Sequence, residues 1–238
     1  MGQYYKVLNV DKKVMLEPWS FDCGAKLMEW SYWKCDMVLA VMNLLANEWK
    51  GDRIFVVGDY AEDDDPNEPC YETLKNLIDE LEIRGKKDEG GYAETIYGYA
   101  SENFQNVSEL ADTEDHGYRY IYNHAKKCFI DIEKCPVEWA WYSKEEKKGH
   151  ITKIAPLPLL LAMGNDRGGG DYHNGHRGFG YVGSWCDTVQ DIEITKEPIA
   201  GLEYEEFAPD FTENKEMIPH TQSLEEIRKV EEKYAELG

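Results

Sequence analysis

Two stretches of this chain repeat one pattern, and that repeat constrains the fold more than any other feature. In 4–17 and in 118–131, alternating apolar and polar residues run into Asn-x-x-Lys-Lys, after which the alternation resumes. The two asparagines, Asn9 and Asn123, are 114 residues apart, and so are the first lysines of each pattern. Alternation around a polar turn predicts a β-hairpin, and asparagine tolerates the left-handed backbone of a tight turn. A fixed offset between two hairpins predicts an internal repeat.

Further matches follow the hairpins in the same order. Each hairpin is followed by a Leu-Leu-Ala or Leu-Leu-Leu-Ala stretch, a tryptophan and then a strand-like run. The matching segments are 44–46 with 160–162, Trp49 with Trp185, and the strands 53–57 with 191–194. The second copy is about 20 residues longer, and the extra length is the glycine-rich stretch. We therefore predict an α+β fold of two pseudo-repeated β-hairpin/helix/β-strand units.

The remaining periodic segments are helical. Asp36 is placed to cap a buried helix that runs to about Trp49, because its apolar residues surround most of the circumference. The acidic insert, within residues 59–118, contains an amphipathic helix by the spacing of Leu74, Leu77, Ile78 and Leu81. Near the end of the chain, Ser223 opens a capping box for a C-terminal helix. We predict two segments, with one compact globule as the alternative. Residues 1–118 hold the first unit and the acidic insert, and residues 119–238 hold the second unit, the glycine-rich loop and an acidic tail.

Negative charge is concentrated in the parts attached to this scaffold. The net charge is -21; residues 59–118 hold 18 acidic and 4 basic residues, whereas residues 1–58 hold 7 of each. This balance argues against direct binding to nucleic acid and against binding to anionic membranes, since both need clustered cations. The densest acidic cluster contains Asp59, Glu62, Asp63, Asp64, Asp65 and Glu68. Such a run is usually a solvated loop, but it also fits an interaction surface for a basic protein partner.

The chain ends and the cysteines give an expectation for the compartment. The N-terminus has no apolar signal-peptide region, and no apolar run approaches the roughly 20 residues of a spanning helix. The six cysteines include no Cys-x-x-Cys, so we expect reduced, buried or half-buried thiols. Together these features predict a cytoplasmic protein.

Residues 164–183 form a glycine-rich loop that holds eight of the 20 glycines. Its backbone amides and two arginines would suit an anion, and Asp-x-His-x-x-His offers ligands for a metal or groups for proton transfer. The alternative is an ordered surface loop whose Asp and Asn side chains bond their own backbone. No phosphate-loop, zinc-protease or Gly-x-Ser-x-Gly pattern is present, so no cofactor or metal is expected. The candidate ligand-binding residues are Arg167, Asp171, His173, His176 and Arg177.

Several of these motifs together resemble a group of uncharacterised bacterial and phage-associated proteins. The shared motifs are Met1-Gly2-Gln3-Tyr4, Trp49 to Ile54, Asn123-x-x-Lys126-Lys127, Leu157 to Leu160 and Gly164 to Tyr172. The resemblance covers about two-thirds of the chain and implies no activity.

Two functional hypotheses follow. The first is a non-enzymatic acidic protein that docks on a basic partner, for example as a nucleic-acid mimic that inhibits a nucleic-acid enzyme in a phage–host setting. The second is a small-ligand-binding or metal-dependent hydrolytic site at the glycine-rich loop. The sequence predicts no oligomeric state.

Overall fold

The computed structural model describes residues 1–63, 65–67, 70–88, 90–143 and 148–209, with residues 229 and 232, and gives only the backbone of 137–143 and 148–151. These residues form helices and mixed sheets, which confirms the α+β class. The capping box at Ser223 and its predicted helix lie outside the described residues, as do Asp64 and Glu68.

The larger sheet is built around the first predicted hairpin. Its strand order is β4-β2-β1-β3-β9, with β1 antiparallel to β2 and β3, and with β4 and β9 added parallel at the two edges. The strands are β1 (Tyr5–Asn9), β2 (Val14–Leu16), β3 (Ile54–Gly58), β4 (Gln105–Asn106) and β9 (Ala162–Met163). Every residue of β1 and of β3 is buried, because the sheet is covered on both faces.

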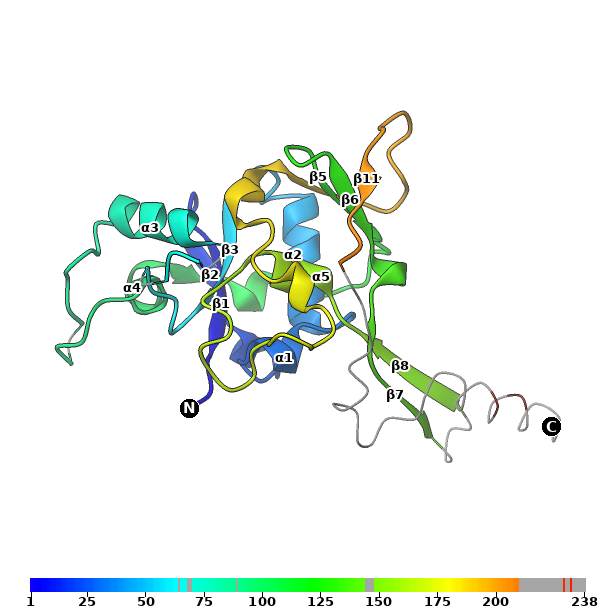
Figure 1. The fold of residues 1–238 in the computed structure, drawn as a ribbon, viewed down its shortest axis with the longest axis horizontal. Helices are drawn as coiled ribbons and strands as arrows, with labels where there is room; N and C mark the ends of the chain where they lie inside the picture. The colour runs from blue at the N-terminus through cyan, green and yellow to red at the C-terminus, as the bar shows by residue number, and fades with distance from the viewer. Residues whose placement is uncertain are drawn as a thin grey trace.

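The second sheet has the order β10-β5-β6-β11. Its central strand β5 is antiparallel to β6 and β10, and β11 lies parallel to β6. Its strands are β5 (Tyr120–Asn123), β6 (Cys128–Asp131), β10 (Ile192–Thr195) and β11 (Glu205–Glu206). The run β11-β6-β5-β10 therefore has the same order and strand directions as β4-β2-β1-β3. A separate hairpin, β7 (Val137–Ser143) with β8 (Lys148–Lys153), extends from this end of the molecule (Figure 1).

The two hairpin turns share one side-chain chemistry. Asn9 Oδ1 accepts a hydrogen bond from the amide of Lys12 at 3.0 Å, and Asn123 Oδ1 accepts from the amide of Lys126 at 2.9 Å. Asparagine tolerates left-handed backbone, but the left-handed residue of each turn is the second lysine: Lys13 has φ 51° and Lys127 has φ 52°. The asparagine closes the turn with its side chain and leaves its own backbone extended in the strand.

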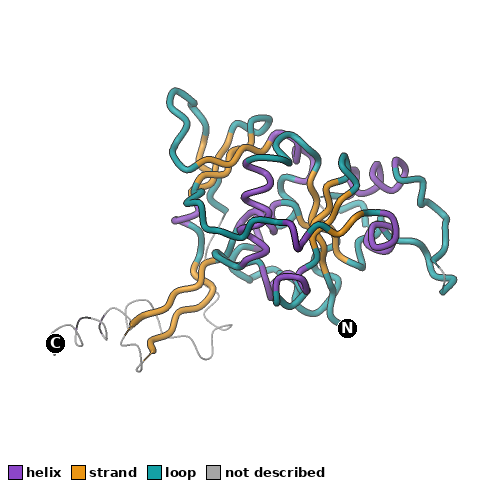
Figure 2. Tube along the Cα trace, turned by 180° about the vertical axis from the view of Figure 1, so that it is seen from behind, coloured by secondary structure: helices purple, strands orange, loops and turns teal. Residues whose placement is uncertain are grey.

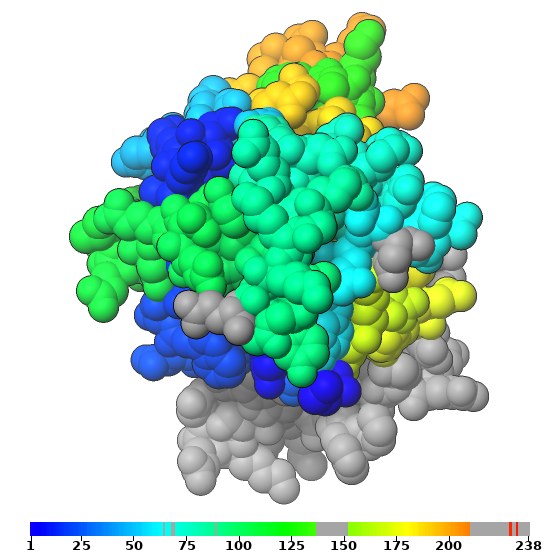
Figure 3. All heavy atoms as spheres, turned by 90° about the vertical axis from the view of Figure 1, so that its left-hand side faces the viewer, coloured from blue at the N-terminus to red at the C-terminus, as the bar shows by residue number. Residues whose placement is uncertain are grey.

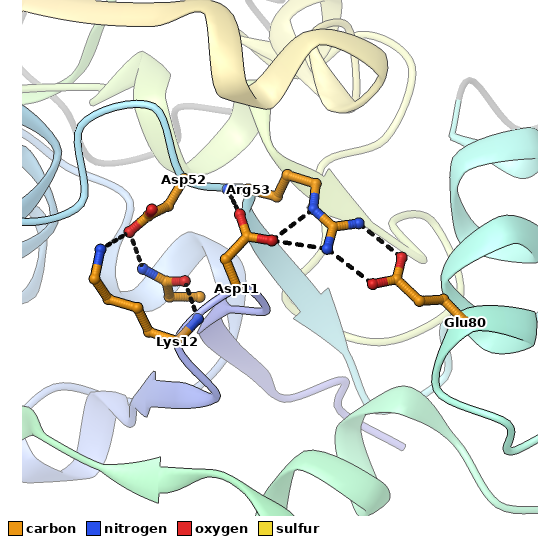
Figure 4. Close-up of polar contacts among 6 residues, drawn as sticks. Asp11, Lys12, Asp52, Arg53 and Glu80 are labelled. Atoms are coloured by element: carbon orange, nitrogen blue, oxygen red, sulfur yellow. Dashed lines mark hydrogen bonds and ion pairs between the residues drawn. The ribbon is translucent and has the colours of Figure 1, made fainter.

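Each turn is also fastened to the start of its third strand. The Asn9 amide and the Lys12 ammonium both contact Asp52 (Figure 4). In the second unit Asn123 Nδ2 donates to Thr188 Oγ1 at 2.8 Å, and the following lysine pairs with Asp187 at 2.9 Å. The two units thus agree in strand order, turn and anchor; their origin by duplication stays a prediction.

One anchor belongs to the first unit alone. The guanidinium of Arg53 makes paired contacts with Asp11 in the turn and with Glu80 in the acidic insert, at 2.7–2.9 Å (Figure 4). Such two-pronged arginine–carboxylate contacts fix geometry as well as charge. Arg53 therefore connects the hairpin, β3 and the insert.

Helices fill the space around the sheets. They are α1 (Leu27–Trp30), α2 (Asp36–Ala46), α3 (Tyr71–Glu80), α4 (Ile96–Asn103) and α5 (Pro156–Leu160), with 3-10 turns at Pro18–Phe21, Ser108–Leu110, Ile132–Lys134, Phe179–Tyr181 and Cys186–Asp191. The ribbon and the Cα tube both place α2 between the two larger sheets (Figures 1 and 2). The sequence prediction ran this helix to Trp49, but it ends at Ala46, where Asn47 leaves helical geometry at φ -129° and its side-chain amide bonds the Asn43 carbonyl.

The two units interlock. Strand β9 comes from the second unit yet completes the first sheet beside β3, while α2 of the first unit packs against β10 of the second. One continuous set of buried residues runs through both, from Val7 and Leu8 to Ile121 and Trp185. Burial of this apolar surface is the main favourable contribution to folding.

Candidate functional site

The carboxylate of Asp171 lies in the interior and not on the surface of the glycine-rich loop. Its Oδ1 accepts a hydrogen bond from the Tyr5 hydroxyl at 2.8 Å, and its Oδ2 accepts from the amides of Arg167 and Gly168, both at 2.8 Å. A buried carboxylate is costly unless hydrogen bonds satisfy it, and three donors do so here. Asp171 therefore orders the loop and fastens it to β1, with its oxygens facing these donors.

A second pair of side chains closes the loop on itself. Asn165 Oδ1 accepts from the amide of Tyr172 at 2.9 Å, and Asn165 Nδ2 donates to the Tyr172 carbonyl at 2.5 Å. The hydroxyl of Tyr172, which is buried, lies 2.9 Å from Ser31 Oγ. The loop is thus an ordered structure held by its own Asn and Asp side chains.

The backbone of the loop lies directly against the N-terminus and α1 (Figure 1). The Gln3 amide donates to the Gly169 carbonyl at 3.1 Å, and the Met28 amide donates to the Gly170 carbonyl at 3.0 Å. Glycine is required for this approach: a Cβ at Gly168 would lie 2.6 Å from the Cβ of Gln3.

The two candidate histidines lie apart from Asp171. The amide of His173 donates to His176 Nδ1 at 2.9 Å, and His173 Nδ1 contacts the exposed carboxylate of Asp166. Burial lowers the pKa of His176, and the nearby His173 adds to the effect. Arg177 is half-buried further along the loop.

Asp171, His173 and His176, which the Asp-x-His-x-x-His spacing offered as an alternative metal site, do not gather as a metal-binding group. Within the part of the chain that the structure describes, the three ligand groups found within 4.8 Å of one another belong to Asp112, Glu114 and His116. Asp112 and Glu114 are exposed and His116 is half-buried.

A pocket of about 650 Å³ opens beside the loop. Its polar rim includes Arg167, whose Nη2 donates to the Glu62 carbonyl at 3.1 Å, and Asp65, whose pKa is lowered by hydrogen bonds from Asn67 and by the charge of Arg167. The other lining residues with polar side chains are Asn67, Asn165, Asp166 and Ser184, and its apolar part includes Cys70, Ala162, Phe179 and Val182. The volume and mixed lining suit a small polar ligand.

The sequence missed Asn67, Cys70 and Ser184 as part of this pocket. Asn67 and Cys70 lie just before α3 and Ser184 lies more than 100 residues later, and they carry no motif, so only the fold brings them together.

The structure divides the predicted acidic surface between three places. Asp59 is half-buried, accepts from the Tyr4 amide at 3.0 Å and has its pKa raised by burial. Asp63 is paired with Arg84 at 2.7 Å, so its charge is neutralised, and Asp65 faces the pocket of the glycine-rich loop. Glu62 lies with Asp59 in a groove.

This acidic groove, of about 510 Å³, lies between the 59–62 segment and the start of α4. Its carboxylates are Asp59, Glu62, Asp88, Glu94 and Glu102, and its other lining residues are Tyr92, Ala93, Thr95, Gly98 and Ser101. No lysine or arginine lines it, and none of the five carboxylates forms an ion pair within the described residues. Figure 3 faces this side of the molecule, where the insert covers the surface.

Local hydrogen bonds hold the groove open. Thr95 Oγ1 caps α4 by accepting from the Gly98 amide at 3.0 Å, and Asp88 Oδ1 closes a turn by accepting from the Tyr92 amide at 2.8 Å. Lys6 donates to Ser101 at the groove wall but is itself paired with Glu17 at 2.8 Å. Lys6 is therefore the ion-pair partner of Glu17 and not of a groove carboxylate.

Comparisons with protein-family models, with curated proteins and with solved structures found no match for this chain. Among the described residues, no helix has both the length and the apolar character needed to cross a membrane.

Proposed function

We propose that this chain is a non-enzymatic binding protein that docks a basic protein partner in the acidic groove. The supporting observation is that five carboxylates line one groove that no lysine or arginine lines, and none of the five forms an ion pair within the described residues. Like charges held close together repel one another, so a partner's lysines and arginines relieve repulsion as well as adding attraction.

The partner class follows from this chemistry. Nucleic-acid enzymes carry clustered cations that contact phosphates, and a groove of carboxylates offers those cations an alternative ligand. The long-range field of a protein with net charge -21 also favours fast association with such a surface.

The test uses fluorescent decalysine as the probe and compares two variants of equal charge. One variant carries Glu62→Gln, Glu94→Gln and Glu102→Gln in the groove. The control carries Glu48→Gln, Glu109→Gln and Glu203→Gln, at residues that are exposed and do not line the groove. At about 0.2–1 kcal/mol for each exposed pair, the groove variant weakens binding about threefold to a hundredfold.

Titrations at low and high salt separate the outcomes. A loss confined to the groove variant, which shrinks at high salt, supports the proposal. Equal losses in both variants would overturn it, because net charge alone would then explain the binding. A lack of binding by the unmutated protein at low salt would also overturn it.

A second candidate is a small-ligand site in the pocket beside the glycine-rich loop. The observation favouring it is that a loop fastened by Asp171 and Asn165 presents Arg167 and Asp166 at a pocket of about 650 Å³. A ligand-observed NMR screen of small carboxylates and phosphates tests it, with Asn67→Trp as the blocked control, because Asn67 is exposed at the rim. Binders that Asn67→Trp removes support this site, and a screen without such binders refutes it.

A further inference from the structure

Two cysteines that neither hypothesis uses lie side by side near the start of α2. Cys23 Sγ and Cys35 Sγ are 3.0 Å apart, and both are free thiols. A disulfide bond is roughly 2.05 Å long, so about 1 Å of movement separates the pair from a bond. The two residues come from different elements: Cys23 follows the 3-10 turn 18–21, and Cys35 is the N-cap of α2.

The backbone is strained on both sides of this contact. Asp22, directly before Cys23, has φ 53°, and Lys34, directly before Cys35, has φ 71°. Left-handed backbone is unfavourable for residues with a side chain and persists only where the surrounding structure imposes it. Here each left-handed residue redirects the chain just before a cysteine.

The surroundings of Cys35 favour its thiolate. Hydrogen bonds from Cys23, from the amides of Met37 and Val38 at the start of α2, and from Tyr32 lower its pKa to about 7. The pKa of Cys23 is raised, first by its hydrogen bond with Cys35. Of the two sulfurs, Cys35 is therefore the one whose thiolate is favoured, and its close contact with Cys23 is the arrangement of a reactive dithiol.

We propose that Cys23 and Cys35 form an oxidisable dithiol that closes to an intramolecular disulfide when the protein meets a peroxide. The Cys35 thiolate attacks one peroxide oxygen; an S–O bond forms, the O–O bond breaks, and hydroxide leaves and takes a proton to become water. The Cys23 sulfur then attacks the Cys35 sulfur; the S–S bond forms, the S–O bond breaks, and the second hydroxide leaves with the Cys23 proton as water. The two sulfurs lose two electrons together, and one peroxide is reduced to two waters.

The segment between these cysteines supports the glycine-rich loop. Its Met28 amide donates to the Gly170 carbonyl at 3.0 Å, and its Ser31 hydroxyl contacts the Tyr172 hydroxyl at 2.9 Å. A bond between Cys23 and Cys35 therefore closes a ring around α1 and restricts the segment on which the loop rests.

The chain contains its own control pair. Cys70 Sγ and Cys186 Sγ are 2.9 Å apart, as close as the first pair, but both residues are buried, with exposed fractions of 2% and 1%. Cys35 is also buried, with an exposed fraction of 4%, but its partner Cys23 is half-buried, so one residue of the pair at α2 is accessible. Because oxidation needs access as well as proximity, the pair at α2 reacts first.

The experiment treats the reduced full-length chain with a small excess of hydrogen peroxide, blocks the remaining thiols with iodoacetamide in denaturant, and maps tryptic peptides without reduction. The expected product is peptide 14–26 linked to peptide 35–50, with two of the six thiols lost. Cys23→Ser and Cys35→Ser each remove the link, whereas the Cys70→Ser/Cys186→Ser double variant keeps it.

The unmutated protein decides the outcome even where a variant fails to fold. The proposal is overturned if peptides 54–75 and 178–196, which carry Cys70 and Cys186, become linked first. It is also overturned if peroxide leaves all six thiols free, or converts Cys35 to a sulfinic acid without a link to Cys23.

Discussion

Replacing Asp171 tests whether this residue orders the glycine-rich loop. Asp171→Ala removes a buried acceptor and leaves the Tyr5 hydroxyl and the amides of Arg167 and Gly168 without their partner. Each buried donor left unsatisfied costs about 1–3 kcal/mol, so three donors lower the free energy of unfolding by about 3 kcal/mol or more. Asp171→Asn keeps the shape: its carbonyl accepts from the two amides and its amide donates to the Tyr5 oxygen. The loss is then about 1–2 kcal/mol, because charge-assisted bonds become neutral ones.

Urea unfolding, followed by tryptophan fluorescence, measures both values. The control is Asp166→Asn in the same loop, whose carboxylate is 57% exposed and whose loss changes stability by less than about 0.5 kcal/mol. A Tyr5→Phe change, combined with Asp171→Asn in a double-mutant cycle, isolates the hydrogen bond between the two side chains. If Asp171→Ala unfolds within 1 kcal/mol of the unmutated chain, the carboxylate does not have the structural role assigned to it.

Three further predictions concern the scaffold. Asn9→Ala and Asn123→Ala each lower the free energy of unfolding by about 1–2 kcal/mol, because each removes the buried side chain that closes a turn. A neutral result in urea unfolding for either would show that its turn does not need the side chain. Gly168→Ala lowers the free energy of unfolding by about 1–3 kcal/mol because its Cβ meets Gln3. Gly169→Ala, whose Cβ contacts begin at 3.6 Å, shifts the thermal unfolding midpoint much less. Equal shifts of the midpoint in the two variants would contradict the packing argument. The Arg119 guanidinium holds the pKa of Asp131 below its ordinary value, so this pair stabilises the fold above about pH 4, and its contribution is lost as the pH falls through the lowered pKa. The Arg119→Gln variant should therefore lose less stability than the unmutated chain between pH 5 and pH 3. Urea midpoints that fall in parallel for the two proteins would refute this.

Local patterns were enough to predict the scaffold. Alternation around Asn9 and Asn123 located both hairpins, and the spacing of Leu74, Leu77 and Ile78 located α3, because these signals lie within one element. The left-handed Lys13 escaped prediction, since the preference of asparagine for turns does not say whether its backbone or its side chain closes the turn.

The candidate sites depended on contacts between distant segments, and there the sequence was less informative. Asp59 and Asp63 are neighbours in sequence, yet one lines the acidic groove and the other pairs with Arg84. Glu94 and Glu102 join Asp59 only because α4 packs against the first sheet, and α4 has no strong periodic signal. Asp171 was grouped with His173 by spacing, but in the fold it is turned inward toward Tyr5.

The pairing of β3 with β9 has a consequence for synthesis of the chain. Val57 pairs with Met163, so this edge of the first sheet has no neighbour until more than 100 further residues have been made. At roughly 5–20 residues per second, that interval lasts about 5–20 s on the ribosome. An uncovered apolar edge invites pairing with other chains. Slowed translation between β3 and β9 should therefore reduce the soluble yield of this protein, although the finished molecule would be the same.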